Sequence, residues 1–368
     1  MYDLGGVGTA WIGLAISGFL AFLGSALLPI LGCAPVRSAE RKPVNVPMSF
    51  SSIDVVVPAY LEVGTVAAKV ESLRAALASY EGLARVIVVA GDAETAAAAA
   101  NADVVIESGR TGKAAACNIG VEHSTADVVV LTDANCEILP PEWPGLTTMA
   151  LQRFDLVSGC KGESGGTEQL FWRFEDALKK SNPRGETLAV AGEFMATPRA
   201  TFTPIPVSAI LDDFQLAASY VNRGLRVGVE SGIRTVEPAA APREQWERRV
   251  RIAHGLLAEA IPMTSALARY AVGRNFLLHK VYRVTLGCLG FWLCILAMTA
   301  LIPPIGLVVI PSLVYINLVY RGVLRCPRVL APIAAVIGMQ FVPPVALLRA
   351  LRKRREEPLS QLWRKVPR

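Results

Sequence analysis

The sequence predicts an α/β domain with a mostly parallel sheet, flanked by apolar helices toward both ends of the chain. Two observations support this fold class. Residues 51–237 alternate short Val- and Ile-rich runs with stretches of helical periodicity. Long runs without charge lie outside them, and only 18% of the 368 residues are charged, against about 25% in soluble proteins. We therefore expect one domain of about 200 residues together with membrane segments.

The first apolar run predicts a transmembrane anchor within residues 1–36. Trp11 to Leu31 carries no charged side chain and is long enough to cross a hydrocarbon layer of about 30 Å as a helix. No Lys or Arg precedes it, which argues against a cleaved signal peptide.

Residues 284–348 predict two or three further membrane segments. The charge-free run Val284 to Tyr320 is too long for one crossing. Pro303 and Pro304 near its middle predict two helices joined by a tight turn. We expect the next run, 329–348, to be re-entrant or interfacial because three prolines interrupt it; a full crossing is the alternative.

Basic residues predict how these segments are oriented. Arg and Lys side chains follow the first run, precede residue 284 and follow Tyr320. The positive-inside rule then places residues 37–283 on the cytoplasmic side of the cell inner membrane. If residues 329–348 crossed the membrane, the basic tail 349–368 would lie outside, against the same rule.

The net charge of +6 comes entirely from this tail. Residues 349–368 hold eight Lys or Arg and two Glu, which leaves 29 basic and 29 acidic residues elsewhere. A nucleic-acid-binding protein is therefore not expected, since the charge outside the tail sums to zero and no base-reading module is apparent. The anionic lipids of the cytoplasmic leaflet are the simplest partner for these charges.

Within residues 51–240, near-continuous Val and Ile runs are typical of strands buried on both faces of a parallel sheet. Small and apolar residues recur at helical spacing between these runs. In such sheets ligands bind at the carboxyl ends of the strands. In chain order we expect strand 53–57, helix 63–80, strand 85–90, helix 93–100, strand 103–106, helix 113–123, strand 127–132 and, later, helix 212–222.

Polar residues follow the first two strands. Pro58 is expected to end the first strand, and Tyr60 and Glu62 could then hold a planar base or a ribose; the alternative is an ordinary turn. Asp92 follows the second strand and either caps the next helix or contacts the same ligand.

A glycine-rich turn precedes the helix that begins at Lys113. Glycines allow the backbone to approach a phosphate, the helix N-terminus favours negative charge, and Lys113 adds a positive charge. The sequence is not a P-loop. An exposed turn with a solvated lysine is the alternative.

Two further pairs of polar residues follow. Asp133 and Asn135 stand two residues apart after a strand and could face one cation, or simply form an Asx turn. Asp212 and Asp213 begin a helix, where one could cap it and the other accept a proton from an attacking hydroxyl. Stabilisation of the helix dipole is the alternative for this pair.

Residues 241–283 predict amphipathic interfacial helices with an arginine-rich motif. Arg248 and Arg251 share a helix face that His254 continues. This face could clamp a pyrophosphate or an acceptor. It could equally lie against anionic lipid head groups.

Taken in order, these motifs resemble the membrane-bound branch of glycosyltransferase family 2, which includes the cellulose, hyaluronan and poly-N-acetylglucosamine synthases. The resemblance covers about residues 53–283. It is carried by Pro-Ala-Tyr-x-Glu, Gly-Lys, Asp-Ala-Asn, Leu-Asp-Asp-Phe and Arg-Arg-x-Arg. It implies an inverting enzyme with the Rossmann-like GT-A fold.

The resemblance also implies a role for each candidate residue. A nucleotide sugar, expected to be a UDP-sugar, would be bound by Pro58, Tyr60, Glu62, Asp92, Lys113 and Asp133. Mg²⁺ or Mn²⁺ would bind at Asp133 and Asn135. Asp213, next to Asp212, would be the catalytic base. The acceptor or the diphosphate would contact Gly192, Glu193, Arg248, Arg251 and His254.

Departures from the family pattern bear on the product. Asn135 replaces the second metal-site Asp, and Ile252 stands where processive synthases have a Trp that helps form the acceptor platform. We therefore expect single transfer to a membrane-proximal glycan or lipid-linked acceptor. The alternatives are a processive β-polysaccharide synthase and a catalytically silent, membrane-anchored nucleotide-binding protein.

Overall fold

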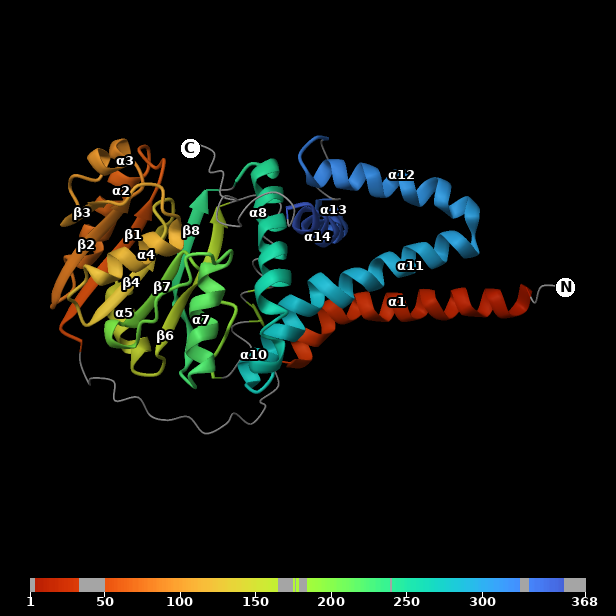
Figure 1. The fold of residues 1–368 in the computed structure, drawn as a ribbon, viewed down its shortest axis with the longest axis horizontal. Coiled ribbons are helices and arrows are strands. Elements are labelled where there is room, and N and C mark those ends of the chain that lie inside the picture. The colour runs from red at the N-terminus through yellow and green to blue at the C-terminus, as the bar shows by residue number, and fades with distance from the viewer. Residues whose placement is uncertain are drawn as a thin grey trace.

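The computed structural model consists of an α/β domain with apolar helices extending from one side of it (Figure 1). It describes residues 4–32, 50–164, 175, 177–178, 184–238, 240–324 and 331–353. Two parts of the chain that the sequence analysis discussed lie outside the described residues. They are the segment between the first helix and the domain, and the basic tail beyond residue 353.

One mixed sheet of eight strands, in the order β3-β2-β1-β4-β7-β6-β8-β5, organises the domain. β1 pairs in parallel with β2 and β4, and β2 with β3, whereas β7 runs antiparallel to both β4 and β6. The carboxyl ends of β1, β2 and β4 therefore meet at one edge. The strands are β1 Ser52–Ala59, β2 Leu83–Ala90, β3 Val104–Glu107, β4 Val128–Thr132, β5 Glu137–Leu139, β6 Leu156–Ser164, β7 Phe194–Pro198 and β8 Val227–Pro238.

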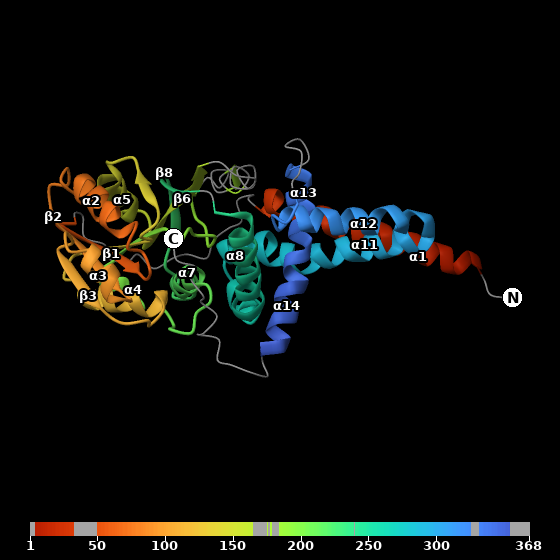
Figure 2. The same cartoon turned by 90° about the horizontal axis from the view of Figure 1, so that it is seen from above.

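Helices cover both faces of this sheet, as the buried Val and Ile runs require. Figure 2 shows α2 and α5 on one face and α4 and α7 on the other. Each layer has its own apolar core: Val70 and Trp143 belong to the first, and Cys117 and Phe214 to the second. The helices are α2 Val66–Leu77, α3 Ala93–Ala98, α4 Lys113–Glu122, α5 Trp143–Leu151 and α7 Asp212–Asn222.

The predicted α/β fold class is confirmed, and the strands and helices expected between residues 53 and 132 are all present. One detail was wrong. Pro58 does not end the first strand, since β1 continues to Ala59 and pairs Pro58 with Val89. Proline lacks only the N–H donor, and its carbonyl can still take part in the ladder. The turn begins at Tyr60 instead.

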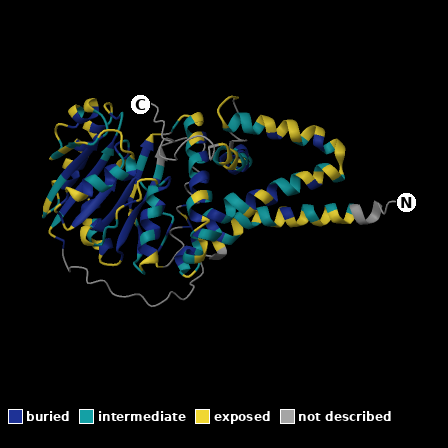
Figure 3. Cartoon of the chain, viewed as in Figure 1, coloured by how far each residue is buried: buried dark blue, intermediate teal, exposed yellow. Residues whose placement is uncertain are grey.

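Among the described residues, four helical segments are long and apolar enough to cross a membrane: Gly8–Ile30, Ala271–Leu301, Pro303–Tyr320 and Ile333–Arg352. As expected, the long run divides at Pro303 and Pro304, which occupy the first turn of α12. Figure 3 shows many exposed residues along α12, among them Leu307 at 80% and Val308 at 68%. The helices are α1 Leu4–Gly32, α10 Ala271–Phe276, α11 Cys288–Leu301, α12 Pro303–Tyr320, α13 Ala331–Gly338 and α14 Val342–Lys353.

The last apolar segment runs in a different direction from the others. Figure 1 shows α14 end-on, whereas Figure 2 shows it across the direction of α1 and α11. It packs against α8, Pro242–Gly255, where Trp246 and Val250 meet Val342 and Ala346. An arginine-rich helix of the domain is thereby joined to the C-terminal apolar helices.

Candidate active site

The loops that follow β1 and β2 are joined through Asp92. Its Oδ1 accepts the Thr95 N–H at 2.8 Å and so caps α3, while its Oδ2 accepts the Leu61 N–H at 2.8 Å. Capping, one of the two roles expected for Asp92, is therefore confirmed. Contact with a base or ribose stays a prediction.

Tyr60 lies in the first of these loops, close to Gly91. A Cβ on Gly91 would come within 2.8 Å of the Tyr60 ring, so a glycine is needed for this approach. The Arg110 guanidinium lies 5.5 Å from the centroid of the same ring. Glu62 is buried and accepts a hydrogen bond from the Thr65 hydroxyl at 2.6 Å. Arg110 was missed as a neighbour of this site.

Lys113 is the first residue of α4 and reaches two acidic groups. The preceding Gly112 has φ of +90°, a backbone conformation that glycine adopts readily. The Lys113 Nζ lies 2.7 Å from Asp133 and 3.3 Å from Asp212. Burial disfavours the ammonium, but these two carboxylates outweigh it and hold the Lys113 pKa well above its usual range. The solvated-lysine alternative is therefore wrong.

Strand pairing brings Asp133 next to Glu193. In the antiparallel ladder Thr132 of β4 pairs with Phe194 of β7, so the residue after β4 and the residue before β7 share one edge. The Thr132 hydroxyl donates to the Glu193 carbonyl at 2.8 Å. Buried Lys69 donates to the same hydroxyl and to the Cys136 carbonyl, and so ties α2 to this edge.

Glu237 completes a group of three carboxylates at this edge. One oxygen each of Asp133, Glu193 and Glu237 lies within 4.8 Å of the others. Burial, opposed by Lys113, raises the Asp133 pKa. Glu193 was predicted on the acceptor side, and the structure places it in this group. Glu237 was missed, and the metal role predicted for Asn135 stays a prediction.

Two cations lie directly against the glutamates of this group. Lys161 on β6 and Arg248 on α8 each form ion pairs with both Glu193 and Glu237. Burial raises the Glu193 pKa, but Lys161 and Arg248 outweigh it and bring the pKa well below its usual range. Glu193 is therefore ionised at neutral pH, in contact with two protein cations.

Asp212 and Asp213 open α7 beside this group. A Cβ on Gly192 would lie 3.1 Å from the Asp213 Cβ, so the segment before β7 passes directly against this side chain. Burial, and then the neighbouring Asp212 carboxylate, raises the Asp213 pKa to about 6. Glu259 accepts hydrogen bonds from the Ile210 and Leu211 N–H groups and fixes the turn that leads into the pair.

The arginine-rich face of α8 points toward the same region. Burial lowers the pKa of Arg251, and the negative charges of Asp212 and Asp213 partly oppose this effect. His254 is buried. At the end of the helix, a Cβ on Gly255 would meet Leu211 at 2.4 Å, which explains the close approach of α8 to the start of α7. The structure therefore brings together Lys113, Asp133, Gly192, Glu193, Asp212, Asp213, Arg248 and Arg251.

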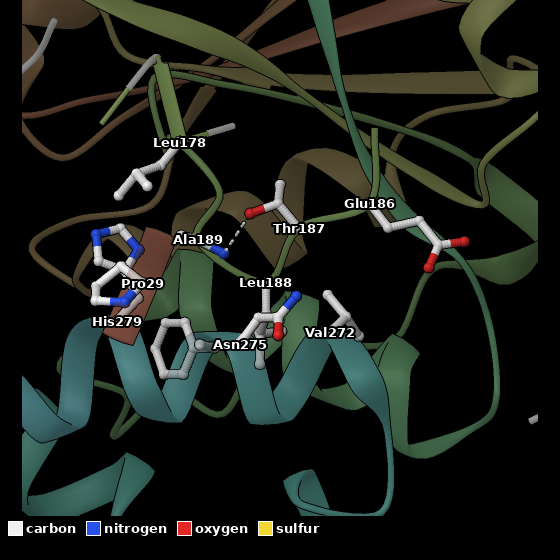
Figure 4. A pocket seen from close by; sticks show the side chains of 10 residues that line it. Pro29, Leu178, Glu186, Thr187, Leu188, Ala189, Val272, Asn275 and His279 are labelled. Carbon is white, nitrogen blue, oxygen red and sulfur yellow. Dashed lines mark hydrogen bonds between the residues drawn. The ribbon is translucent and has the colours of Figure 1, made fainter. Parts of the chain in front are cut away.

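A cavity lies between residues 186–189 and the segment 272–279, which includes most of α10 (Figure 4). His279 and Leu178 line one end of it, beside Pro29 of α1. Its volume of about 50 Å³ suits water rather than a sugar. The carboxylate cluster is therefore the better candidate for chemistry.

Comparisons with known proteins agree with this architecture. A family model described as glycosyl transferase family 2 matches residues 54–203. A mannosyltransferase from Pyrobaculum calidifontis, solved with GDP-Man and Mn²⁺, shares the fold at TM-score 0.63 and 18% identity, over 93% of this chain and 98% of that one. The mannosyl-3-phosphoglycerate synthase of Rubrobacter xylanophilus gives TM-score 0.43 and 16% identity, over 58% of this chain and 75% of that one.

No curated protein matches the chain, and a relation to the cellulose and hyaluronan synthases is not shown. The family match begins in β1 and ends just after β7. It therefore spans the strands and turns that carry Lys113, Asp133 and Glu193. The chain is a glycosyltransferase with a GT-A-like fold, and its residues 54–203 match the model of glycosyltransferase family 2.

Proposed function

We propose that this protein is an inverting, metal-dependent transferase that moves a sugar from a nucleotide sugar to a membrane-proximal glycan or lipid-linked acceptor. The observation that carries the proposal is the position of Asp213. It is a half-buried carboxyl with a pKa raised to about 6, next to the cluster that holds the Lys113–Asp133 ion pair.

Asp213 is proposed as the general base. It takes the proton of the acceptor hydroxyl, whose oxygen forms a bond to the anomeric carbon as the bond to the diphosphate oxygen breaks. Attack from the face opposite the leaving group inverts the anomeric configuration. A pKa of about 6 suits this task, because the group is ionised at neutral pH and still basic enough to accept a proton.

Lys113 and Arg251 are proposed to stabilise the diphosphate as negative charge develops on it. Lys113 is held at the helix N-terminus by two carboxylates, so its position is set before a ligand arrives. Tyr60, Glu62 and Arg110 line the turns where the base and ribose are expected.

The residues at Asp133 fit a divalent cation. Mg²⁺ and Mn²⁺ prefer oxygen ligands, and three carboxylates approach one another here. Asp133, with Asn135 two residues on, is proposed to hold the ion, which would supply positive charge to the diphosphate. The mannosyltransferase of similar fold was solved with Mn²⁺ and GDP-Man, so GDP-sugars belong beside the proposed UDP-sugars in any donor screen.

A donor screen on the purified chain in lipid nanodiscs tests this function. With Mn²⁺ or Mg²⁺, one donor should release nucleotide in an acceptor-dependent way. Asp213→Asn should lower turnover by about 10²- to 10⁴-fold. Asp127→Asn is the matched control, because Asp127 bonds to Ser51 at the opposite end of the strands, and its turnover should stay near wild type.

Nucleotide release at an unchanged rate in Asp213→Asn would exclude Asp213 as the base. Absence of release with every donor and metal would favour a silent nucleotide-binding protein. The length of the product separates single transfer from processive synthesis.

A further inference from the structure

The helix that carries the proposed base lacks the usual capping side chain. α7 begins at Asp212, and the position before it is Leu211, whose side chain makes no capping hydrogen bond. An apolar side chain cannot accept the N–H groups left free at the start of a helix. Ile210 and Leu211 are both buried, so their N–H groups need a partner within the protein.

Glu259 supplies that partner from a distant part of the chain. Its Oε1 accepts the Ile210 N–H at 2.6 Å, and its Oε2 accepts the Leu211 N–H at 3.2 Å. Glu259 lies in the π-helical turn Leu256–Ala260, which follows α8 directly. Because each carboxylate oxygen bonds to one of two successive N–H groups, Glu259 fixes both the position and the orientation of the backbone that enters α7.

Two further contacts join the start of α7 to the same part of the chain. Gly255 packs so closely on Leu211 that a Cβ at Gly255 would come within 2.4 Å of it. Phe214, in the first turn of α7, stacks on Phe276 of α10 with 5.0 Å between the ring centroids. Figure 1 shows α7 beside α8. The start of α7 is therefore held by the segment 255–276, which leads from α8 into the apolar helices.

We propose that Glu259 is a positioning residue, which fixes the turn before α7 and so aims the Asp213 carboxylate at the acceptor hydroxyl. The inference rests on the proposed role of Asp213 as general base and adds the residue that holds this base in place. Asp213 stands two residues after Leu211, so a shift of the backbone at Leu211 moves its carboxylate. A displacement of about 1 Å can lower a rate by about 10²-fold.

Steady-state kinetics of the full chain in nanodiscs test this role, with the donor and metal that support transfer. Glu259→Met removes both acceptor oxygens from a side chain of similar length and should lower kcat by about 10- to 100-fold. The KM for the donor should stay near that of wild type, because Glu259 bonds to the backbone before α7 and acts only through it.

Two conservative variants separate the reach of the side chain from its charge. Glu259→Gln loses the charge but keeps an oxygen for the shorter bond, so its kcat should stay within about 5-fold of wild type. Glu259→Asp keeps the charge but is one methylene shorter and cannot reach both N–H groups. Its kcat should fall almost as far as that of Glu259→Met.

The link to Asp213 is tested by combining two variants. In Asp213→Asn the base is already lost, so the addition of Glu259→Met should cause little further fall in turnover. A role of Glu259 in folding alone would lower turnover equally in both backgrounds.

Asp103→Leu is the matched control for the loss of a carboxylate that accepts a backbone N–H. Asp103 accepts the Val86 N–H at 2.8 Å, near the start of β2 and therefore away from the carboxyl ends of the strands. Its kcat should stay near wild type.

An unchanged kcat in Glu259→Met, with Asp213→Asn inactive, would overturn the inference and leave the proposed base standing. Equal falls in the two backgrounds would also overturn it. Where Glu259→Met folds poorly, Glu259→Gln and Glu259→Asp decide the point, and an equal kcat of these two variants would contradict the inference. If Asp213→Asn keeps wild-type turnover, the proposed base fails and the inference fails with it.

Discussion

At the scale of single residues, the acidic side chains of the site differ in their surroundings and therefore in their protonation. Glu193 lies against Lys161 and Arg248, which outweigh burial and keep it ionised. Asp213 is half-buried beside Asp212, and desolvation together with this neighbouring carboxylate raises its pKa to about 6. One carboxylate is thus committed to an ion pair, whereas the other can exchange a proton near neutral pH.

This difference predicts a pH profile. A general base acts in its ionised form, so kcat/KM should fall about 10-fold for each pH unit below about 6 and level off above it. The fall in kcat/KM begins near pH 6 because the Asp213 pKa is raised. An unperturbed aspartate would still be ionised at pH 5. Rates at saturating metal from pH 5 to 8 check this.

The residual activity of Asp213→Asn should lack that acidic limb. If the variant kept an acidic limb at the same pH, the titration seen in wild type would belong to a group other than Asp213. Stability has to be followed alongside, for example by tryptophan fluorescence, so that unfolding at low pH is not read as titration.

At the scale of secondary-structure elements, the apolar helices associate through small residues. α1 lies along α11, where a Cβ on Gly18 would come within 2.6 Å of the Gly290 carbonyl oxygen, and a Cβ on Gly290 within 2.6 Å of Ala21. Small residues allow helices to approach closely where lipid removes the hydrophobic driving force. By contrast, the exposed apolar side chains of α12 are those expected of a surface facing lipid.

This contact predicts a difference between two glycines of the same helix. Gly18→Leu places a side chain against the backbone of α11 and should destabilise the protein by about 1–3 kcal/mol, as overpacking generally does. Gly13→Leu is the control, because nothing lies within 4 Å of a Cβ at Gly13.

The two variants are compared by thermal unfolding in detergent, which is measured as the loss of monodisperse protein with rising temperature. A similar shift in the unfolding temperature of both variants would mean that the close contact of Gly18 with α11 does not determine how the two helices pack. Glu175 forms ion pairs with Lys280 and Arg283 and a hydrogen bond with His279, and these contacts also join the domain to these helices.

At the scale of the whole molecule, the direction of α14 bears on membrane topology. We propose that the catalytic domain is cytoplasmic and that the last apolar segment lies along the membrane surface. The proposal is supported by α14 running across α1 and α11 (Figure 2) and by the Arg349–Glu247 ion pair that links it to α8. This arrangement agrees with the positive-inside rule, because the basic residues of 349–368 would then not have to lie outside.

Cysteine labelling in inside-out membrane vesicles tests this topology. With a membrane-impermeant maleimide, Ser360→Cys in the tail and Glu81→Cys in the domain should both react, whereas Asp3→Cys should react only after detergent is added. Wild type gives the background from native cysteines, four of which are buried. Protection of Ser360→Cys in intact vesicles would show that the last segment crosses the membrane.

The sequence by itself determined the α/β fold, the order of strands and helices, the apolar segments and the turns that carry Lys113, Asp133 and Asp213. These follow from local patterns, because periodicity, glycine turns and strand ends depend on residues that are close together in the sequence. Only the tertiary structure decided that Lys161 and Glu237 belong to the site. Lys161 meets partners 32 and 76 residues away, and such pairs depend on strand order and register, which no local pattern encodes.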